Sequence, residues 1–147
     1  MDGSASPPAV LFSVDMPLRW ADLDADGRVN NVQVLRFAEE ARMRWAAALD
    51  LPAHAPGLAP VVAHLACTYR AALHYPGTVR AELACSRLGR SSLQLECALH
   101  LLGPDAAGPV HVADVSVAWV WTDAATGASH PMPALLRQRC EAPSPLA

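Results

Sequence analysis

Hydrophobic residues change their spacing along the chain, and the change separates a helical part from a sheet part. Between Asn30 and Leu49 apolar side chains recur every three or four residues, which predicts one long helix. Its apolar stripe consists of Val34, Phe37, Ala38, Ala41, Trp45 and Leu49. Asp50 and Pro52 are expected to end the helix, because proline cannot continue one.

After the helix the period becomes two, as in strands that bury one face. The alternation is clearest at Leu93, Leu95, Cys97, Leu99 and Leu101, and again at Val115, Val117, Trp119 and Trp121. Predicted strands cover residues 61–75, 78–88, 92–102 and the segment around 115–121. An edge strand over residues 10–20, bent by Pro17, precedes the helix. A last short helix is predicted over residues 134–141.

Short polar segments connect these elements. Residues 56–60 are expected to form a loop, and Pro76-Gly77, residues 89–92 and residues 103–109 are plausible hairpin connections. Consecutive short connections predict antiparallel pairing. The expected fold class is therefore α+β, with one long helix wrapped by a curved antiparallel sheet of about five strands.

Length and composition fit one globular domain. We expect a disordered lead at residues 1–9, a domain at residues 10–141 and a flexible tail at residues 142–147. A net charge of −3 and a pI near 6.0 provide no basic field for nucleic acid or anionic lipid. No apolar run has the length of a membrane span, and the first eight residues resemble no secretory signal. A cytoplasmic location is the default expectation.

The four cysteines are widely spaced and form no C-x-x-C pair, so neither a zinc site nor a redox motif is expected. Three of them lie within alternating apolar segments, where a free cysteine is usually a small core residue.

Candidate chemistry is concentrated just before the long helix. Asp22, Asp24 and Asp26 precede Gly27, and the only two asparagines of the chain, Asn30 and Asn31, open the helix. A carboxylate folded over a helix N-terminus gives a nucleophile or base that faces an oxyanion site. The ordinary alternative is that Asp24 only stabilises the helix start. A calcium loop is disfavoured, because Gln33 stands where its glutamate is needed.

The segment D-L-D-A-D-G-R-V-N-N, followed by L-R-F-A-E-E-A-R, resembles the D-x-D-x-x-G-H-V-N-N … E-E-A-R signature of hotdog-fold acyl-CoA thioesterases, the 4-hydroxybenzoyl-CoA thioesterase-like family. Residues 69–79, 86–92 and 120–127 are also similar to the strands and turns that follow in this family. The resemblance covers roughly residues 10–141.

This resemblance implies a long helix inside an antiparallel sheet, in a homodimer or homotetramer whose active sites lie at the subunit interface. It implies that Asp24 is the catalytic carboxylate, acting as nucleophile or general base on an acyl-CoA thioester. The backbone N–H near Asn31 would polarise the thioester carbonyl. No metal and no cofactor are expected.

Two departures from the signature concern the site. Arg28 replaces the family's histidine, and Val34 replaces the usual aromatic residue. An arginine at position 28 could hold Asp24 ionised through an ion pair. Glu39 and Glu40 are further carboxylate candidates, because some hotdog enzymes place theirs on the helix. Glu40 falls in the polar row with Arg36 and Arg44, which favours a surface salt bridge.

For CoA binding, the resemblance points to the turn that contains Arg87, Gly89, Arg90 and Ser91, where arginine and serine can hold phosphate or pantetheine oxygens. A plain hairpin turn with solvated arginines is the alternative. His64 is a weaker substrate-binding candidate, because it follows an apolar strand start.

The expected function is hydrolysis of an acyl-CoA to free acid and CoA. One alternative is hydrolysis of an acyl-carrier-protein thioester, for which Arg28, Arg87 and Arg90 would attract the acidic carrier. Another is a catalytically silent hotdog protein that binds acyl-CoA, an alternative favoured by the loss of the histidine at position 28.

Overall fold

The computed structural model describes residues 6–51, 55–104 and 107–144. In chain order its elements are β1 (Val10–Pro17), the short 3-10 helix η1 (Trp20–Asp22), α1 (Asn31–Ala48), β2 (Leu58–Tyr69), β3 (Thr78–Leu88), β4 (Ser92–Leu102), β5 (Val110–Asp123) and α2 (Ala134–Glu141). The expected lead and tail fall partly on residues 1–5 and 145–147, which lie outside the described residues.

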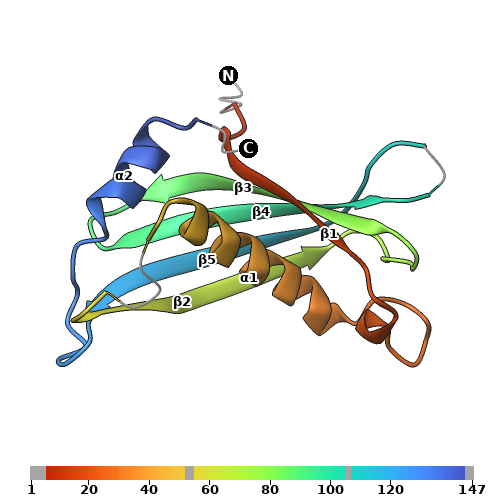
Figure 1. Ribbon diagram of the computed structural model, residues 1–147, viewed down its shortest axis with the longest axis horizontal. Helices are drawn as coiled ribbons and strands as arrows, with labels where there is room; N and C mark the ends of the chain where they lie inside the picture. Colours follow the sequence, from red (N-terminus) through yellow and green to blue (C-terminus); the bar gives the residue numbers. More distant parts are fainter. Residues whose placement is uncertain (1–5, 52–54, 105–106, 145–147) are drawn as a thin grey trace, which may run out of the picture.

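One five-stranded antiparallel sheet organises the molecule (Figure 1). The spatial order is β1-β3-β4-β5-β2, so β1 and β2 form the two edges. β3, β4 and β5 are joined by the two predicted hairpins, around Gly89 and after Gly103. The predicted α+β fold class, one long helix with a curved antiparallel sheet, is confirmed.

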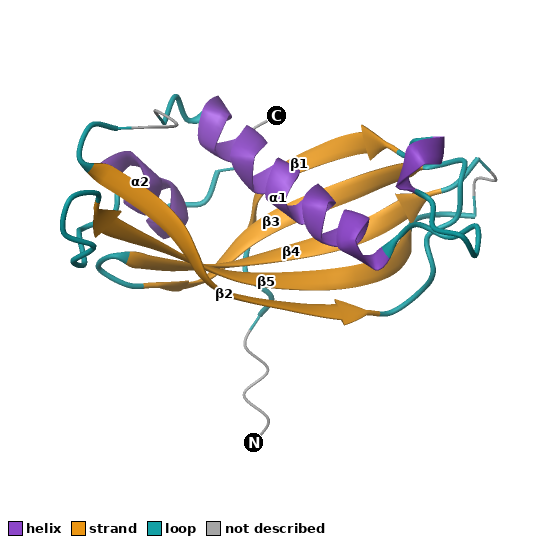
Figure 2. Ribbon diagram, turned by 90° about the horizontal axis from the view of Figure 1, so that it is seen from below, coloured by secondary structure: helices purple, strands orange, loops and turns teal. Residues whose placement is uncertain are grey.

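Helix α1 lies across the inner face of the curved sheet (Figure 2). All six residues of the predicted apolar stripe are buried, and Trp45 is 1% exposed. They pack against the buried residues of the central strands, which include Leu83, Leu95 and Val115. The apolar side chains that recur every 3.6 residues in the helix and every two residues in the strands therefore form a single core.

Strand β2 differs from its prediction at both ends. It begins at Leu58, inside the segment expected to be a loop, and Pro60 pairs with Trp121 of β5. A proline is tolerated there because β2 is an edge strand. The strand ends at Tyr69, after which the N–H groups of Arg70 and Ala71 both donate to the carbonyl of Val112.

The predicted hairpin at Pro76-Gly77 is wrong. β2 pairs with β5 and β3 pairs with β1, so residues 70–77 carry the chain from one side of the sheet to the other. On the way Leu73 is buried, and its carbonyl accepts the N–H of Val29 at 3.0 Å. A Cβ on Gly77 would come within 2.7 Å of the Leu101 side chain and 3.2 Å of the Leu102 carbonyl oxygen, so a larger residue here would require these neighbours to shift.

Smaller differences concern the strand ends. β1 stops at Pro17, so Trp20 lies in η1, and β5 extends from Val110 to Asp123. Helix α2 has the predicted bounds. Asp50 follows α1 with a φ of 53°, a left-handed conformation typical of helix ends. None of the helices within the described residues is long and apolar enough to cross a membrane.

Candidate functional site

Asp22 anchors the loop between β1 and α1. Its side chain is 1% exposed and accepts hydrogen bonds from the backbone N–H of Arg19 at 2.8 Å and from the Arg19 guanidinium at 2.9 Å. Burial alone raises the pKa of Asp22, but these bonds lower it by more, so the pKa lies below its ordinary value. Its carbonyl accepts the N–H of Asn30, which joins this anchor to the start of α1.

Asp24 is partly buried and is held in a tight turn. One carboxylate oxygen accepts the backbone N–H groups of Asp26 at 2.9 Å and Arg28 at 3.2 Å. The Asp24 N–H donates to the Arg28 carbonyl at 2.7 Å, and Gly27 adopts a φ of 74° that closes the turn. The carboxylate is thus oriented by its own loop and does not cap the helix.

Asn30 caps α1 instead. Its side-chain oxygen accepts the N–H of Val32 at 2.9 Å. Within the described part of the chain, the backbone N–H of Asn31 has no acceptor. The Asn31 carbonyl accepts the hydroxyl of Tyr69 at 3.0 Å, so the end of β2 is tied to the helix start. A free N–H at the positive end of the helix dipole suits a developing oxyanion.

The expected ion pair between Arg28 and Asp24 does not form. The Arg28 side chain is exposed and lies 3.6 Å from Asp26, whereas Asp24 receives only the backbone N–H of Arg28. The turn brings the backbone of residue 28 toward Asp24 and directs its side chain to solvent. Arg28 therefore supplies no charged partner for the Asp24 carboxylate within one chain.

The two helix glutamates differ in their surroundings. Glu40 pairs with Arg44 on the surface, as predicted. Glu39 is exposed and lies one turn before Arg42 and Met43, which line a pocket between α1 and the sheet. Glu39 is therefore the helix carboxylate on the pocket side.

The turn proposed for CoA lies at the opposite end of the sheet from Asp24. β3 starts beside Pro17 and runs for 11 residues to this turn, a span of about 35 Å. Arg87 and Arg90 are exposed there. The carbonyl of Gly89 accepts the Arg137 side chain of α2, and the hydroxyl of Ser91 accepts that of Ser129 at 2.8 Å. The backbone and Ser91 thus already have partners, and the two arginine side chains face solvent.

His64 lies on the exposed edge strand β2, next to an irregularity in its pairing with β5. Among the described residues, no hydrogen bond or ion pair links His64 to Asp24. One chain therefore does not bring the sequence-predicted site residues together: Asp24, Arg28 and Asn31 share one end, His64 is on the edge strand, and Arg87, Gly89, Arg90 and Ser91 are at the other end.

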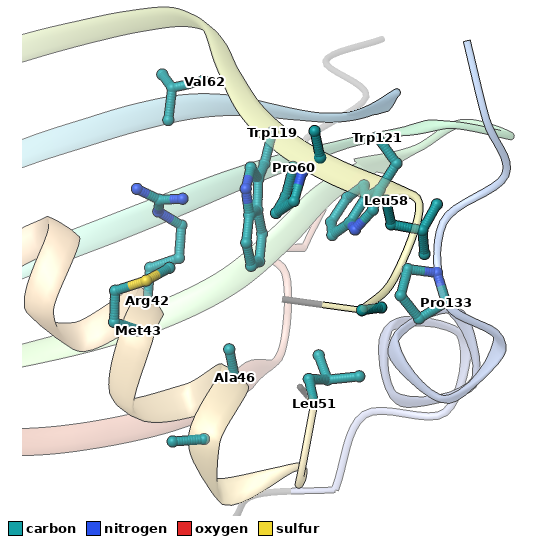
Figure 3. Close-up of a pocket in the computed structure, with 13 residues that line it drawn as sticks. Arg42, Met43, Ala46, Leu51, Leu58, Pro60, Val62, Trp119, Trp121 and Pro133 are labelled. Carbon is teal, nitrogen blue, oxygen red and sulfur yellow. The ribbon is translucent and has the colours of Figure 1, made fainter. Parts of the chain in front are cut away.

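The structure contains a pocket of about 700 Å³ that was not predicted from the sequence (Figure 3). It lies between the C-terminal half of α1, the start of β2 and the end of β5. Trp119 and Trp121 form one wall, with ring centroids 4.6 Å apart. Arg42 lines it as well, and its position between Ala38 and Trp45 in the apolar stripe was the available signal. No group of three or more His, Cys, Asp or Glu suited to a metal ion exists among the described residues.

Comparisons with solved structures find close similarity in fold. The PA2801 protein of Pseudomonas aeruginosa, provisionally named a thioesterase, has 35% identity and a TM-score of 0.80, covering 88% of this chain and 98% of its own. A protein of Xanthomonas campestris, provisionally named an acyl-CoA thioesterase, has 30% identity and a TM-score of 0.72, covering 84% and 100%. The 1,4-dihydroxy-2-naphthoyl-CoA thioesterase of Synechocystis shares the fold, with 18% identity, a TM-score of 0.75 and coverage of 89% and 96%.

No curated protein matches the sequence significantly. The family comparison, in contrast, matches residues 18–140, which include the loop before α1, the whole sheet from β2 to β5 and most of α2. Together with the sheet order and the helix that it wraps, this match shows that the chain belongs to the thioesterase-like superfamily.

Proposed function

We propose that the protein is an acyl-CoA thioesterase that hydrolyses an acyl-CoA to free acid and CoA. The observation that carries this proposal is that a partly buried, loop-oriented Asp24 carboxylate and the free N–H of Asn31 lie at the same end of the fold, at the start of α1. A positioned carboxylate and an oxyanion donor are the two groups that thioester hydrolysis needs, because CoA thiolate is a good leaving group.

Two routes lead to the same products. As general base, Asp24 takes a proton from water while the water oxygen bonds to the thioester carbon. The C–S bond then breaks, and the departing CoA sulfur takes up the proton. As nucleophile, Asp24 bonds to that carbon and expels CoA thiolate, and water then hydrolyses the resulting anhydride. In both routes the Asn31 N–H donates to the carbonyl oxygen as it gains negative charge.

We further propose that the active unit is a homodimer paired through β2. Val61, Val62, Leu65 and Tyr69 of this edge strand are each more than 40% exposed, and an unpaired apolar edge is a template for pairing with another chain. Twofold pairing of antiparallel strands places the Asp24 end of one chain beside the opposite end of its partner. The pocket and the Arg87–Ser91 turn of one chain would then adjoin Asp24 of the other, and His64 would lie in the interface.

The test is release of free thiol from acyl-CoAs of short, medium, long and aromatic acyl groups. We expect turnover on at least one of them. An acyl-carrier-protein substrate is assayed in parallel, because the exposed arginines at both ends of the sheet could hold an acidic carrier. Turnover only on the carrier substrate would replace the CoA proposal, and binding of acyl-CoA without any turnover would indicate a silent binder.

A further inference from the structure

Arg42 is a charged residue placed where α1 otherwise buries apolar side chains. It is 8% exposed, and its guanidinium lies over the ring of Trp119, 4.8 Å from the centroid. Its Nε is buried without a hydrogen-bond partner, and the guanidinium takes part in no hydrogen bond or ion pair within the described residues. Burial lowers the pKa of Arg42, and the charge of Glu39 acts in the opposite direction. An arginine nevertheless stays protonated.

The guanidinium faces the pocket described above. Among the lining residues that the structure describes, Arg42 is the single charged one; the others are Met43, Ala46, Ala47, Leu51, Ala55, Leu58, Ala59, Pro60, Val62, Trp119, Trp121 and Pro133. Figure 3 shows Arg42 at one end of the pocket, near Val62 and Trp119, with Leu58 and Pro133 toward the other end. The volume of about 700 Å³ is in the range of small-molecule sites.

An unpaired charge in such a pocket determines which occupant it favours. A purely hydrocarbon acyl chain would displace water from the guanidinium and leave its donors unpaired, which is unfavourable. A carboxylate at the same place would accept the charge-assisted, bidentate hydrogen bonds that arginine geometry provides. The apolar walls would meanwhile hold the methylene or aromatic part of the acyl group.

We propose that this pocket binds the acyl group of the substrate and that Arg42 selects acyl groups bearing a second carboxylate, so that the preferred substrates are CoA monothioesters of dicarboxylic acids. This inference rests on the proposed thioesterase function and specifies its substrate class. Arg42 acts here as a specificity residue, and the bond-breaking step stays with Asp24.

The test compares acyl-CoA pairs of equal chain length that differ only in the terminal group: glutaryl with pentanoyl, adipoyl with hexanoyl, and suberoyl with octanoyl. For at least one pair, wild type is expected to favour the dicarboxylic member in kcat/KM by about 10-fold or more, the value of a charge-assisted hydrogen bond. Arg42→Met should remove this preference, and Arg42→Lys should keep part of it. Arg44→Met is the matched control, because Arg44 is exposed and pairs with Glu40.

A binding measurement separates failure of this inference from failure of the proposed function. Non-hydrolysable thioether analogues, S-alkyl-CoA with and without a terminal carboxylate, are titrated calorimetrically into wild type and Arg42→Met, whose melting temperatures confirm folding. We expect tighter binding of the carboxylated analogue by wild type alone. Equal affinities, or no binding of either analogue, would overturn the inference. Equal kcat/KM for both members of every pair in wild type, or a dicarboxylic preference that persists in Arg42→Met, would overturn it too, while leaving the thioesterase function intact.

Discussion

Asp22 and Asp24 are two residues apart, yet their carboxylates have different surroundings. Asp22 is buried and bonded to Arg19, whereas Asp24 is partly buried and accepts only backbone N–H groups of its own turn. Spacing in the sequence could identify the pair but could not assign these roles, because the difference depends on where Arg19 and Arg28 point. The first aspartate holds the loop, and the second is left available for chemistry.

Replacement of Asp22 tests whether this residue holds the loop, because loss of that role should lower the free energy of unfolding. Because its folded pKa is depressed below the usual value near 3.8, its contribution to stability is complete above that pH and is lost as the pH falls through the folded pKa. We expect Asp22→Asn to lower the free energy of unfolding by about 2 kcal/mol at pH 7. The deficit should shrink in denaturant titrations below pH 4.

Asp26→Asn is the control for this experiment, because Asp26 is exposed and its contact with Arg28 is a surface pair. We expect a change below about 1 kcal/mol for this variant. A deficit of Asp22→Asn that is the same at pH 7 and pH 3 would contradict the role assigned to its ionised carboxylate.

At the scale of elements, regular hydrophobic spacing was sufficient for α1 and β4, whose predicted and observed bounds agree closely. It was insufficient for the partner of β2. The Pro76-Gly77 segment has the composition of a hairpin turn, but a local turn signal does not say which strands become neighbours. That choice depends on the core, in which α1 packs against β3, β1 and β5. The crossing therefore could not be predicted from composition.

Strand β2 is the element on which the proposed dimer depends. We expect wild type to be at least dimeric by light scattering, and Leu65→Arg to shift it toward monomer, because a charge on an exposed strand edge opposes pairing. Leu135→Arg on α2 is the matched control, since Leu135 is 40% exposed and Leu65 is 42% exposed. Equal oligomeric states for wild type and Leu65→Arg would contradict pairing through β2.

At the scale of the whole molecule, the residues expected to form the site are split between two ends of the sheet. The loop that contains Asp24 is at one end, and the Arg87–Ser91 turn and the pocket wall formed by Trp121 are at the other. The motif and the fold class could be predicted from the sequence, but the distances between the motifs depend on the three-dimensional fold. Arg42 was overlooked for a related reason: its environment is set by Trp119, 77 positions further along the chain.

A mixed dimer tests whether one site uses both chains. Asp24→Asn removes the carboxylate, and Ala46→Trp fills the pocket; each homodimer should be inactive. In a purified heterodimer of the two variants, one of the two sites combines an intact carboxylate with an intact pocket, so about half of the wild-type activity should return. No recovery in a folded heterodimer would indicate that carboxylate and pocket belong to one chain.

If Asp24 performs thioester hydrolysis, steady-state thiol release on the best acyl-CoA must depend on its carboxylate. Asp24→Asn is compared with Asp26→Asn, from the same turn, and with Glu39→Gln, from the pocket side of α1. We expect kcat to fall by about 100-fold or more in Asp24→Asn alone. Wild-type kcat in Asp24→Asn, with the loss in Glu39→Gln instead, would contradict it and assign the chemistry to the helix carboxylate.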